Sequence, residues 1–515
     1  MTENVRISHI DSDALGEVAL VGYTETRMNR RQFVQAGLLG LPFHARAQTA
    51  GRPKNVLLLM SDQHRRDCLG IEGNRFARTP NLDALARSGA RFGAAYCSNP
   101  VCTPSRASLL TGLYTHHHQT WDNATPWPFE HKTIAHYFGR AGYMTALIGK
   151  MHFVDAQTHG FDYRLDFNDW YQYLGPKTKL YADELSRANS GSGMPEIDDL
   201  WREEGDPWKG ARALDSRKGS VAVGRVSEIP EQDHFDSFVA RETVRFLKNH
   251  GRQQPFFAIC SCLKPHDPFM PARRFAEMYR AEDMPLPPTW GKVDPSKVPA
   301  QVRDLIRFNG PTPELSDPLQ AKHRIAMYYA NLAQMDDALG QVFAALRELD
   351  LEKDTVVLYT SDHGELLGDH GLWQKFQFYE GSCGVPLIIR APGVTTAGAK
   401  CAMPVSQVQV LPTLAELCGV SVPPLDCPSL VPQLRDVTAV RDQPVFAEFD
   451  LQTPRAKYML RRGDFKYTFR VDDMAELYDL KRDPEEMTNL ALIDRQRVEQ
   501  MKKELFAWYT PPEIR

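Results

Sequence analysis

A cysteine at the start of a predicted helix offers the most reactive combination of residues in this chain. Cys102 is followed by Thr103-Pro104-Ser105-Arg106, and proline suits the first helical position because its missing N–H costs nothing there. Backbone N–H groups at a helix N-terminus favour an anion, and Arg106 can share a face with Cys102. The spacing predicts a nucleophile beside an anion-binding helix end. A buried structural cysteine is the alternative.

Two acidic motifs follow two predicted strands. Asp62 and Gln63 come after one apolar run, and Asp362 and His363 come after another. Ligand sites in open α/β sheets lie beyond the carboxyl ends of the strands, so these side chains would form one oxygen-rich site. Such a site suits calcium or magnesium, and the nitrogen of His363 also admits manganese. Two ordinary turn aspartates are the alternative.

Further cationic and imidazole groups follow other predicted strands. Lys150 and His152 come after an apolar segment, His266 comes after the next one, and Lys375 follows the second acidic motif by a short loop. One lysine on a loop is usually a solvated charge. Several positive groups at one sheet edge, around a thiol at a helix start, predict a pocket for a tetrahedral oxyanion.

The elements that must position these residues read as a layered α/β fold, because buried apolar runs alternate with helical segments. The predicted strands cover 55–60, 143–148, 255–263, 355–360 and 386–390. One predicted helix has Pro104 at its first position, just after Cys102, and continues through Leu113, and the others cover 80–88, 238–249 and 319–349. The last helix is the longest, and its stripe of Tyr329, Leu332, Met335 and Leu339 should lie in the core.

The pattern changes near residue 430. Short alternating segments at 445–449, 458–461 and 465–469 predict an antiparallel sheet, and a closing helix is expected over 495–508. These features indicate a smaller C-terminal α+β domain.

We therefore expect an N-terminal extension at 1–50, a catalytic domain at 51–430 and a C-terminal subdomain at 431–515. Residues 181–230 are rich in Gly, Ser and charge and predict an insertion or lid. Residues 284–318 are proline-rich and are expected to be irregular.

Length and composition limit the classes of function that this chain can have. A chain of 515 residues can bury a large core and hold more than one domain. Its formal net charge of −4 argues against a broad nucleic-acid or membrane surface, and no apolar run is long enough to span a bilayer. The nine cysteines are scattered without zinc spacing and do not form a disulfide framework. We expect neither nucleic acid nor a membrane span, and the oligomeric state is left open.

The N-terminus predicts an export address. The pair Arg30-Arg31 precedes a short apolar stretch at 34–43 and small residues at 45–47. This order resembles a bacterial twin-arginine signal, with Met28 as the true start, and places the protein in the periplasm. An ordinary basic terminus on a cytoplasmic protein is the alternative.

Two longer stretches resemble the signatures of the sulfatase family, within the alkaline-phosphatase-like superfamily. They are CTPSRASLLTG at 102–112 and GYMTALIGKMH at 142–152. The resemblance in order and spacing extends from about Asn55 to the C-terminal domain. It implies an alkaline-phosphatase-like mixed sheet sandwiched by helices, and it implies a sulfuric ester hydrolase.

The resemblance also implies that Cys102 is converted to formylglycine by a formylglycine-generating enzyme or an equivalent maturase. One hydroxyl of the hydrated aldehyde would attack sulfur and form a covalent sulfate intermediate. The second hydroxyl would then expel sulfate. Asp62, Gln63, Asp362 and His363 would bind the cation, which would hold a sulfate oxygen and lower the pKa of the attacking hydroxyl. Calcium is expected, with magnesium or manganese as alternatives.

The remaining roles implied by the resemblance follow from charge. Arg106 would brace the formylglycine and the metal site. Lys150 and Lys375 would neutralise charge on the sulfate oxygens and the leaving oxygen. His152 would bond the diol and accept its proton, and His266 would protonate the departing alcohol.

Two positions separate branches of the family. Many members carry Asp where Gln63 stands and Asn where His363 stands. The pair found here, together with Asn123, which we expect to contact sulfate, is similar to the choline-sulfatase-like and phosphonate-monoester-hydrolase-like branches. Phosphonate hydrolases usually lack the pair Lys150 and His152, so a small-molecule or carbohydrate sulfate ester is favoured. A phosphonate monoester or phosphodiester hydrolase is the alternative, and a non-catalytic oxyanion-binding protein with an unmodified thiol is a third hypothesis.

Overall fold

A computed structural model describes residues 55–512, except 129, 154–156, 182–223, 310–315 and 440–441. The chain divides into Met1–His44 and Ala45–Arg515, and the described residues all belong to the second unit. The expected export signal and most of the expected insertion at 181–230 lie outside the described residues. The expected boundary near residue 430 stays a prediction.

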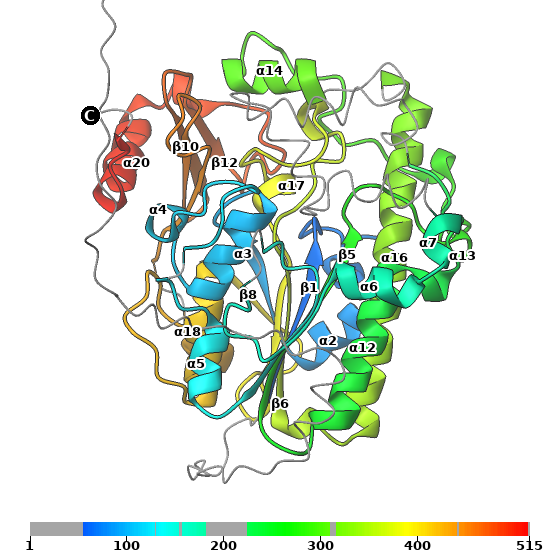
Figure 1. Ribbon diagram of the computed structural model, residues 1–515. Helices are drawn as coiled ribbons and strands as arrows, with labels where there is room; N and C mark the ends of the chain where they lie inside the picture. Colours follow the sequence, from blue (N-terminus) through cyan, green and yellow to red (C-terminus); the bar gives the residue numbers. More distant parts are fainter. Residues whose placement is uncertain are drawn as a thin grey trace, which may run out of the picture. The chain divides into compact units, whose positions relative to one another are not determined.

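The centre of the fold is an eight-stranded sheet with strand order β4-β3-β5-β1-β6-β7-β2-β8 (Figure 1). Its strands are β1 (Asn55–Asp62), β2 (Ala90–Tyr96), β3 (Met144–Gly149), β4 (Tyr163–Leu165), β5 (Phe256–Pro265), β6 (Thr355–Ser361), β7 (Leu387–Arg390) and β8 (Ala399–Ser406). β7 runs antiparallel to β6 and β2, and the other neighbouring strands are parallel. The expected mixed α/β sheet is confirmed.

The five predicted strands correspond to β1, β3, β5, β6 and β7. The sequence did not predict β2, β4 and β8. β4 has only three residues, while β2 and β8 mix small or polar residues with few strand formers. Their pairing with neighbouring strands, rather than their own composition, places them in the sheet.

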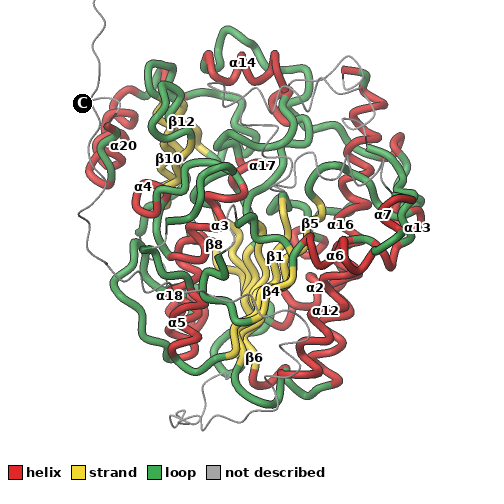
Figure 2. The backbone as a smooth tube through the Cα atoms, in the orientation of Figure 1, coloured by secondary structure: helices red, strands yellow, loops and turns green. Residues whose placement is uncertain are grey.

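Helices cover both faces of this sheet, as Figures 1 and 2 show. Successive residues of a strand point to opposite faces. Leu57 and Leu59 of β1 accordingly join one core with α2, α12 and α16, whereas Val56, Leu58 and Met60 join another with α3, α5 and α18. The bounds of these helices are α2 (Pro80–Ser88), α3 (Cys102–Thr111), α5 (Ile134–Arg140), α12 (Phe235–His250), α16 (Pro318–Glu348) and α18 (Val410–Cys418).

The long helix α16 confirms the expected helix over 319–349. The Asp317 carboxylate caps it by accepting from the N–H groups of Leu319 and Gln320 at 2.8 and 2.9 Å. All four residues of the predicted core stripe are buried. Burial extends around most of the helix, because it packs against the sheet and against α12 and α13 (Arg273–Ala276).

Helix α3 differs from the prediction at both ends. It begins at Cys102 itself, so Pro104 is the third helical residue and not the first. The missing N–H is still harmless there, since the first turn has no intrahelical acceptors. The helix ends at Thr111 because Gly112 takes a left-handed conformation, with φ 69°.

The expectation of irregular structure at 284–318 is wrong in part, because α14 (Ala300–Asn309) lies within it. The Asp473 carboxylate accepts from the N–H groups of Ala300 and Gln301 at 2.9 and 2.8 Å. A side chain that is distant in the sequence therefore caps this helix, and no pattern in the local sequence predicts this cap.

A four-stranded antiparallel sheet with order β12-β11-β10-β9 follows, as predicted. Its strands are β9 (Val445–Phe449), β10 (Lys457–Arg462), β11 (Phe465–Arg470) and β12 (Glu476–Asp479). Helix α20 (Arg495–Trp508) packs on β10 and β11, with Met501 and Leu505 in their shared core.

Short helices complete the connections. They are α4 (Thr115–His118), α6 (Phe167–Leu174), α7 (Lys177–Leu180), α17 (Glu380–Cys383) and α19 (Val431–Arg435). Single 3₁₀ turns occur at Gly70–Glu72, Glu231–Asp233, Ala281–Asp283, Glu352–Asp354, Asp369–Gly371, Gln407–Gln409 and Leu490–Leu492. Within the described part of the chain, none of the helices has the length and apolar character needed to cross a bilayer.

Candidate active site

The register of the two central strands brings the two acidic motifs together. β1 and β6 are parallel neighbours, and Ser61 pairs with Ser361. The next residue in each chain segment, Asp62 and Asp362, therefore stands at the same level of the sheet edge. The N-terminus of α3 brings Cys102 to the same place, and the predicted convergence of these motifs is found.

Cys102 lies at the centre of this group. Its Sγ is 3.2 Å from His363 Nε2, 3.2 Å from Lys375 Nζ and 3.8 Å from Asp62 Oδ1. One ligand atom from each of Asp62, Cys102, Asp362 and His363 lies within 4.8 Å of all the others, and all four residues are buried. This donor set fits a divalent cation that binds oxygen and nitrogen.

Arg106 clamps both carboxylates from inside the fold. Its Nε donates to Asp362 Oδ2 at 2.8 Å, and its NH2 donates to Asp62 Oδ2 at 2.9 Å. Its NH1 donates to the Lys150 carbonyl at 2.6 Å and to Ser261 Oγ at 3.0 Å. Asp62 Oδ1 is thereby left facing Cys102, whereas Asp362 Oδ1 accepts from the backbone N–H groups of Gln63 and His363 at 3.1 and 2.9 Å.

The cluster separates the pKa values of the two acids. Burial alone would raise the pKa of Asp62, but Lys150, at 2.9 Å, together with His266 and Arg106, holds it well below its usual range. Burial raises the pKa of Asp362, and Arg106 offsets this only in part. Asp62 is therefore the more firmly ionised of the two.

Charge also favours an anion at position 102. Burial and the neighbouring Asp62 act to raise the pKa of the Cys102 thiol. Lys375, Lys150 and His363 outweigh them and hold this pKa well below its usual range. A group that carries negative charge at position 102 is stabilised by the same three side chains.

Lys375 connects four of the predicted site residues. Besides the thiol, its Nζ lies 3.2 Å from Gln63 Oε1, 3.1 Å from His266 Nε2 and 3.1 Å from His363 Nε2. The ammonium therefore stands within reach of a sulfate oxygen placed beside position 102.

Lys150 and His152 follow a close contact between β3 and β5. Gly149 has φ 112°, and a Cβ there would lie 2.0 Å from the Ser261 carbonyl oxygen, so only glycine fits. His152 is buried, and burial lowers its pKa although the Cys102 side chain opposes this shift. A neutral imidazole suits the predicted role of His152 as a proton acceptor.

His266 and Asn123 lie next to the residues that surround Cys102. His266 Nδ1 donates to the Asp267 carbonyl at 2.6 Å, and its Nε2 lies 3.1 Å from Lys375 Nζ. Asn123 Oδ1 accepts from the Thr103 N–H at 3.0 Å. Asn123 therefore lies at the N-terminus of α3, next to position 102.

The sequence did not identify Glu365 and Asp267, the two acids that lie next to the amide nitrogen of Gln63. Gln63 Nε2 donates to Glu365 Oε2 and lies 3.4 Å from Asp267 Oδ2. Asp267 Oδ1 in turn accepts from Arg324 NH2 at 2.6 Å. Glu365 lies two residues after His363, and Asp267 directly follows His266. Their position in the sequence near predicted site residues was the one feature that could have indicated a role for them.

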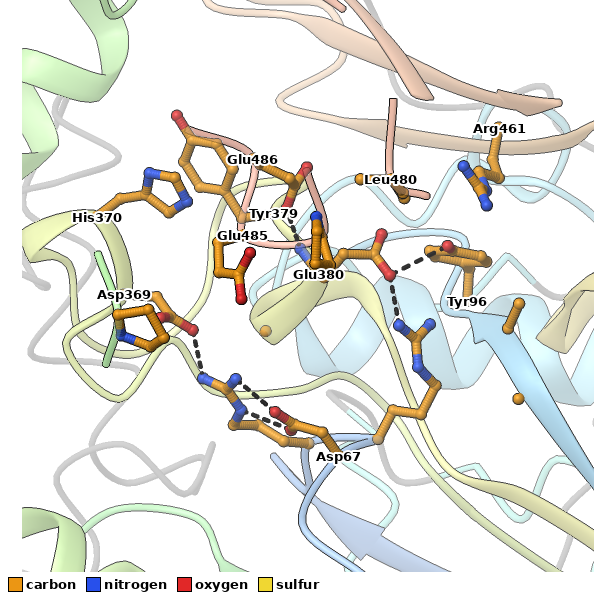
Figure 3. Close-up of a pocket in the computed structure, with 17 residues that line it drawn as sticks. Asp67, Tyr96, Asp369, His370, Tyr379, Glu380, Arg461, Leu480, Glu485 and Glu486 are labelled. Carbon is orange, nitrogen blue, oxygen red and sulfur yellow. Dashed lines mark hydrogen bonds and ion pairs between the residues drawn. The ribbon is translucent and has the colours of Figure 1, made fainter. Parts of the chain in front are cut away.

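A separate cavity of about 420 Å³ contains none of the predicted site residues. Figure 3 shows that side chains from several loops and strands line it, among them Asp369, Tyr96, Tyr379, Glu380, Arg461 and Glu486, and Arg65 also lines it. Arg65 bonds the carboxylates of Asp67 and Asp369 at 2.8 and 2.7 Å, and Glu380 accepts from the Tyr96 hydroxyl at 3.1 Å. Arg65 and Glu380 are thus paired, and none of the residues that surround Cys102 lines this cavity.

Comparison with known proteins agrees with this geometry. A family model described as Sulfatase matches residues 54–420. The chain belongs to the sulfatase family. A second model, described as N-sulphoglucosamine sulphohydrolase, C-terminal, matches residues 368–509. The resemblance of the two signature stretches is confirmed, and the protein is an enzyme of this hydrolase family.

Individual relatives cover nearly the whole chain. A choline-sulfatase of Rhizobium meliloti is 34% identical over 466 residues, which are 88% of this chain and 85% of the relative. An arylsulfatase of Clostridium perfringens is 30% identical over 87% of this chain and 93% of its own length. The crystal structure of a phosphonate monoester hydrolase of Agrobacterium radiobacter superposes with a TM-score of 0.74 at 27% identity, covering 89% of this chain and 95% of that one.

Proposed function

We propose that this enzyme hydrolyses sulfate esters by means of a formylglycine at position 102 and a divalent cation. One observation carries the proposal. The Cys102 side chain lies 3.2 Å from both Lys375 and His363, within a buried set that includes two carboxylates. A nucleophile, a cation site and positive charge for a tetrahedral oxyanion therefore share one small volume.

The residues around position 102 fit the cation that the family implies. Asp62 and Asp362 each give Oδ2 to Arg106 and keep Oδ1 free of it, while Gln63 Oε1 and His363 Nε2 face the same cluster through Lys375. We infer calcium, with magnesium or manganese as alternatives. The cation would polarise a sulfate oxygen and favour the ionised form of the attacking hydroxyl.

The other side chains provide the nucleophile, neutralise charge and transfer protons. As a formylglycine hydrate, position 102 supplies one hydroxyl to attack sulfur and another to release sulfate. Lys150 and Lys375 neutralise charge on the sulfate oxygens and the leaving oxygen. His266 donates a proton from Nε2 to the departing alcohol, and the neutral His152 accepts a proton from the diol.

We further propose a small-molecule or carbohydrate sulfate ester as the substrate, with Asn123 contacting the sulfate. The names of the two curated relatives, a choline-sulfatase and an arylsulfatase, support a sulfate ester. The proposal includes maturation by a formylglycine-generating enzyme or an equivalent, and export to the periplasm through the twin-arginine segment. N-terminal sequencing of the mature protein should give a start near Gln48; a start before it would contradict export.

A phosphonate monoester hydrolase is the second candidate, because Gln63 and His363 depart from the usual Asp and Asn and because a structural neighbour carries that name. Rates on nitrophenyl sulfate and on a nitrophenyl phenylphosphonate decide between the two. We expect the sulfate to be the better substrate by kcat/KM. A large preference for the phosphonate would overturn the choice, and Cys102→Ala, a folded control without a nucleophile, should be inactive on both.

A further inference from the structure

Gln63 faces opposite kinds of partner at the two ends of its amide. Its Oε1 lies 3.2 Å from the Lys375 ammonium. Its Nε2 donates to Glu365 Oε2 and lies 3.4 Å from Asp267 Oδ2. A flipped amide would set its oxygen against two carboxylates and its NH₂ against an ammonium, so this environment permits one orientation.

We propose that Glu365 and Asp267 are positioning residues that hold Gln63 Oε1 toward the cation. The proposal rests on the proposed function in one respect, namely that Gln63 is a cation ligand. It also explains the departure at position 63. A carboxylate there would face Glu365 with no hydrogen between them, whereas an amide supplies the hydrogen and still offers an oxygen to the cation.

Both positioning carboxylates are themselves fixed on their outer oxygens. Glu365 is fully buried, and its Oε1 accepts from the backbone N–H groups of Gln374 and Leu367 at 2.6 and 3.2 Å. Asp267 Oδ1 accepts from Arg324 at 2.6 Å. Glu365 Oε2 is left for Gln63, and Asp267 Oδ2 is shared between Gln63 Nε2 at 3.4 Å and Gln374 Nε2 at 3.5 Å.

Glu365 also ties Gln63 to the loop that carries Lys375. The Gln374 N–H that bonds Glu365 belongs to the residue before Lys375, and Gln374 has φ 67°. Glu365 therefore orients one predicted ligand and anchors the backbone next to the ammonium that faces it.

The geometry predicts what each substitution does. In Glu365→Gln the new side chain has one acceptor oxygen, yet both Gln63 and the two backbone N–H groups require an acceptor. One side must lose its bond, and the Gln63 amide is no longer held. In Gln63→Glu two carboxylates meet. In the double variant, which combines Gln63→Glu with Glu365→Gln, the new amide at position 365 gives its oxygen to the backbone. Its NH₂ then donates to the new carboxylate at position 63, so the contact between positions 63 and 365 is restored. The contact of position 63 with Asp267 Oδ2, which is 3.4 Å in the wild type, is not restored.

The experiment measures calcium binding to the chelator-treated full-length enzyme by titration calorimetry, together with kcat and KM on nitrophenyl sulfate. We expect each single variant to bind calcium about 10–100-fold more weakly, the usual effect of losing a partner of a metal ligand. The double variant should recover the part of that loss that comes from the contact between positions 63 and 365. A purely structural role for Glu365 does not predict recovery from a second substitution.

Asp336→Asn is the matched control, since Asp336 is also a buried carboxylate that accepts from two backbone N–H groups, at 3.0 and 2.9 Å. It should leave calcium affinity unchanged. Wild-type affinity in Glu365→Gln, or no recovery in the double variant, would overturn the positioning role while leaving the proposed function intact. If the wild-type enzyme binds no calcium, magnesium or manganese, the proposed function and this inference both fail.

Discussion

Arg106→Lys tests how the site holds its two carboxylates. The guanidinium is fully buried and makes four hydrogen bonds, to Asp362, Asp62, the Lys150 carbonyl and Ser261. A lysine keeps the charge but has a single nitrogen, which cannot reach both carboxylates in the fork geometry. The variant therefore separates the effect of the forked hydrogen-bond geometry from the effect of the positive charge.

The magnitude follows from the bonds lost. A hydrogen bond to a charged group contributes about 1.5–3 kcal/mol. If lysine keeps half of the four bonds, two are lost, and the free energy of unfolding should fall by about 3–6 kcal/mol, similar to the cost of disrupting a buried ion pair. The freed carboxylates should also bind calcium about tenfold or more weakly, because their orientation is no longer fixed.

Arg470→Lys provides a matched control. Arg470 is also a buried arginine, and it bonds Glu476, Gln301 and Gln377 in the C-terminal part of the chain. Urea denaturation should show comparable destabilisation of both variants, while calorimetry should show weaker calcium binding only for Arg106→Lys. If Arg106→Lys loses less than about 1 kcal/mol, or retains wild-type calcium affinity, the clamp described above is wrong.

Three further results are expected. If His266 protonates the leaving oxygen, as proposed, His266→Gln should lower kcat/KM about 100-fold or more on an alkyl sulfate but much less on nitrophenyl sulfate. Equal losses on the two substrates would exclude that role. Removal of the cation with a chelator should abolish turnover, and calcium should restore it; full activity of metal-free enzyme would exclude the cation site. Burial lowers the pKa of His118 to about 3, and the neutral Nδ1 accepts from the Thr120 N–H at 3.1 Å. As pH falls below 6.5, His118 therefore gains a proton in the unfolded chain but stays neutral in the folded protein. The free energy of unfolding should therefore fall by about 2 kcal/mol between pH 6.5 and pH 5. In denaturation experiments, His118→Asn, whose oxygen can accept the same hydrogen bond, should remove that part of the pH dependence. If the variant has the same dependence of stability on pH as the wild type, this explanation is refuted.

The sequence predicted the parts of the fold that are locally encoded. β1, β5 and β6 are continuous apolar runs buried on both faces, and such runs are identifiable without a structure. Their carboxyl ends meet at one sheet edge, which is why the residues that follow them could be assigned to one site. β2 and β8 carry no such run, and they join the sheet through their partners.

Long-range contacts account for what the sequence did not predict. The cap of α14 comes from Asp473, which lies 173 residues after Ala300. Glu365 looks like an ordinary acid after a turn, and its importance depends on Gln63, 302 residues away in the chain. The start of α3 at Cys102 rather than Pro104 depends on the extended backbone of Val101, which composition does not reveal.

The central claim concerns the chemical state of position 102. Preparations made with different amounts of maturase can be compared by peptide mass spectrometry across residue 102 and by turnover of nitrophenyl sulfate with saturating calcium. Turnover per enzyme should rise in proportion to the fraction of peptide that carries the aldehyde, and it should extrapolate to zero for the pure thiol. Equal turnover in a preparation whose Cys102 is wholly unmodified would contradict the account.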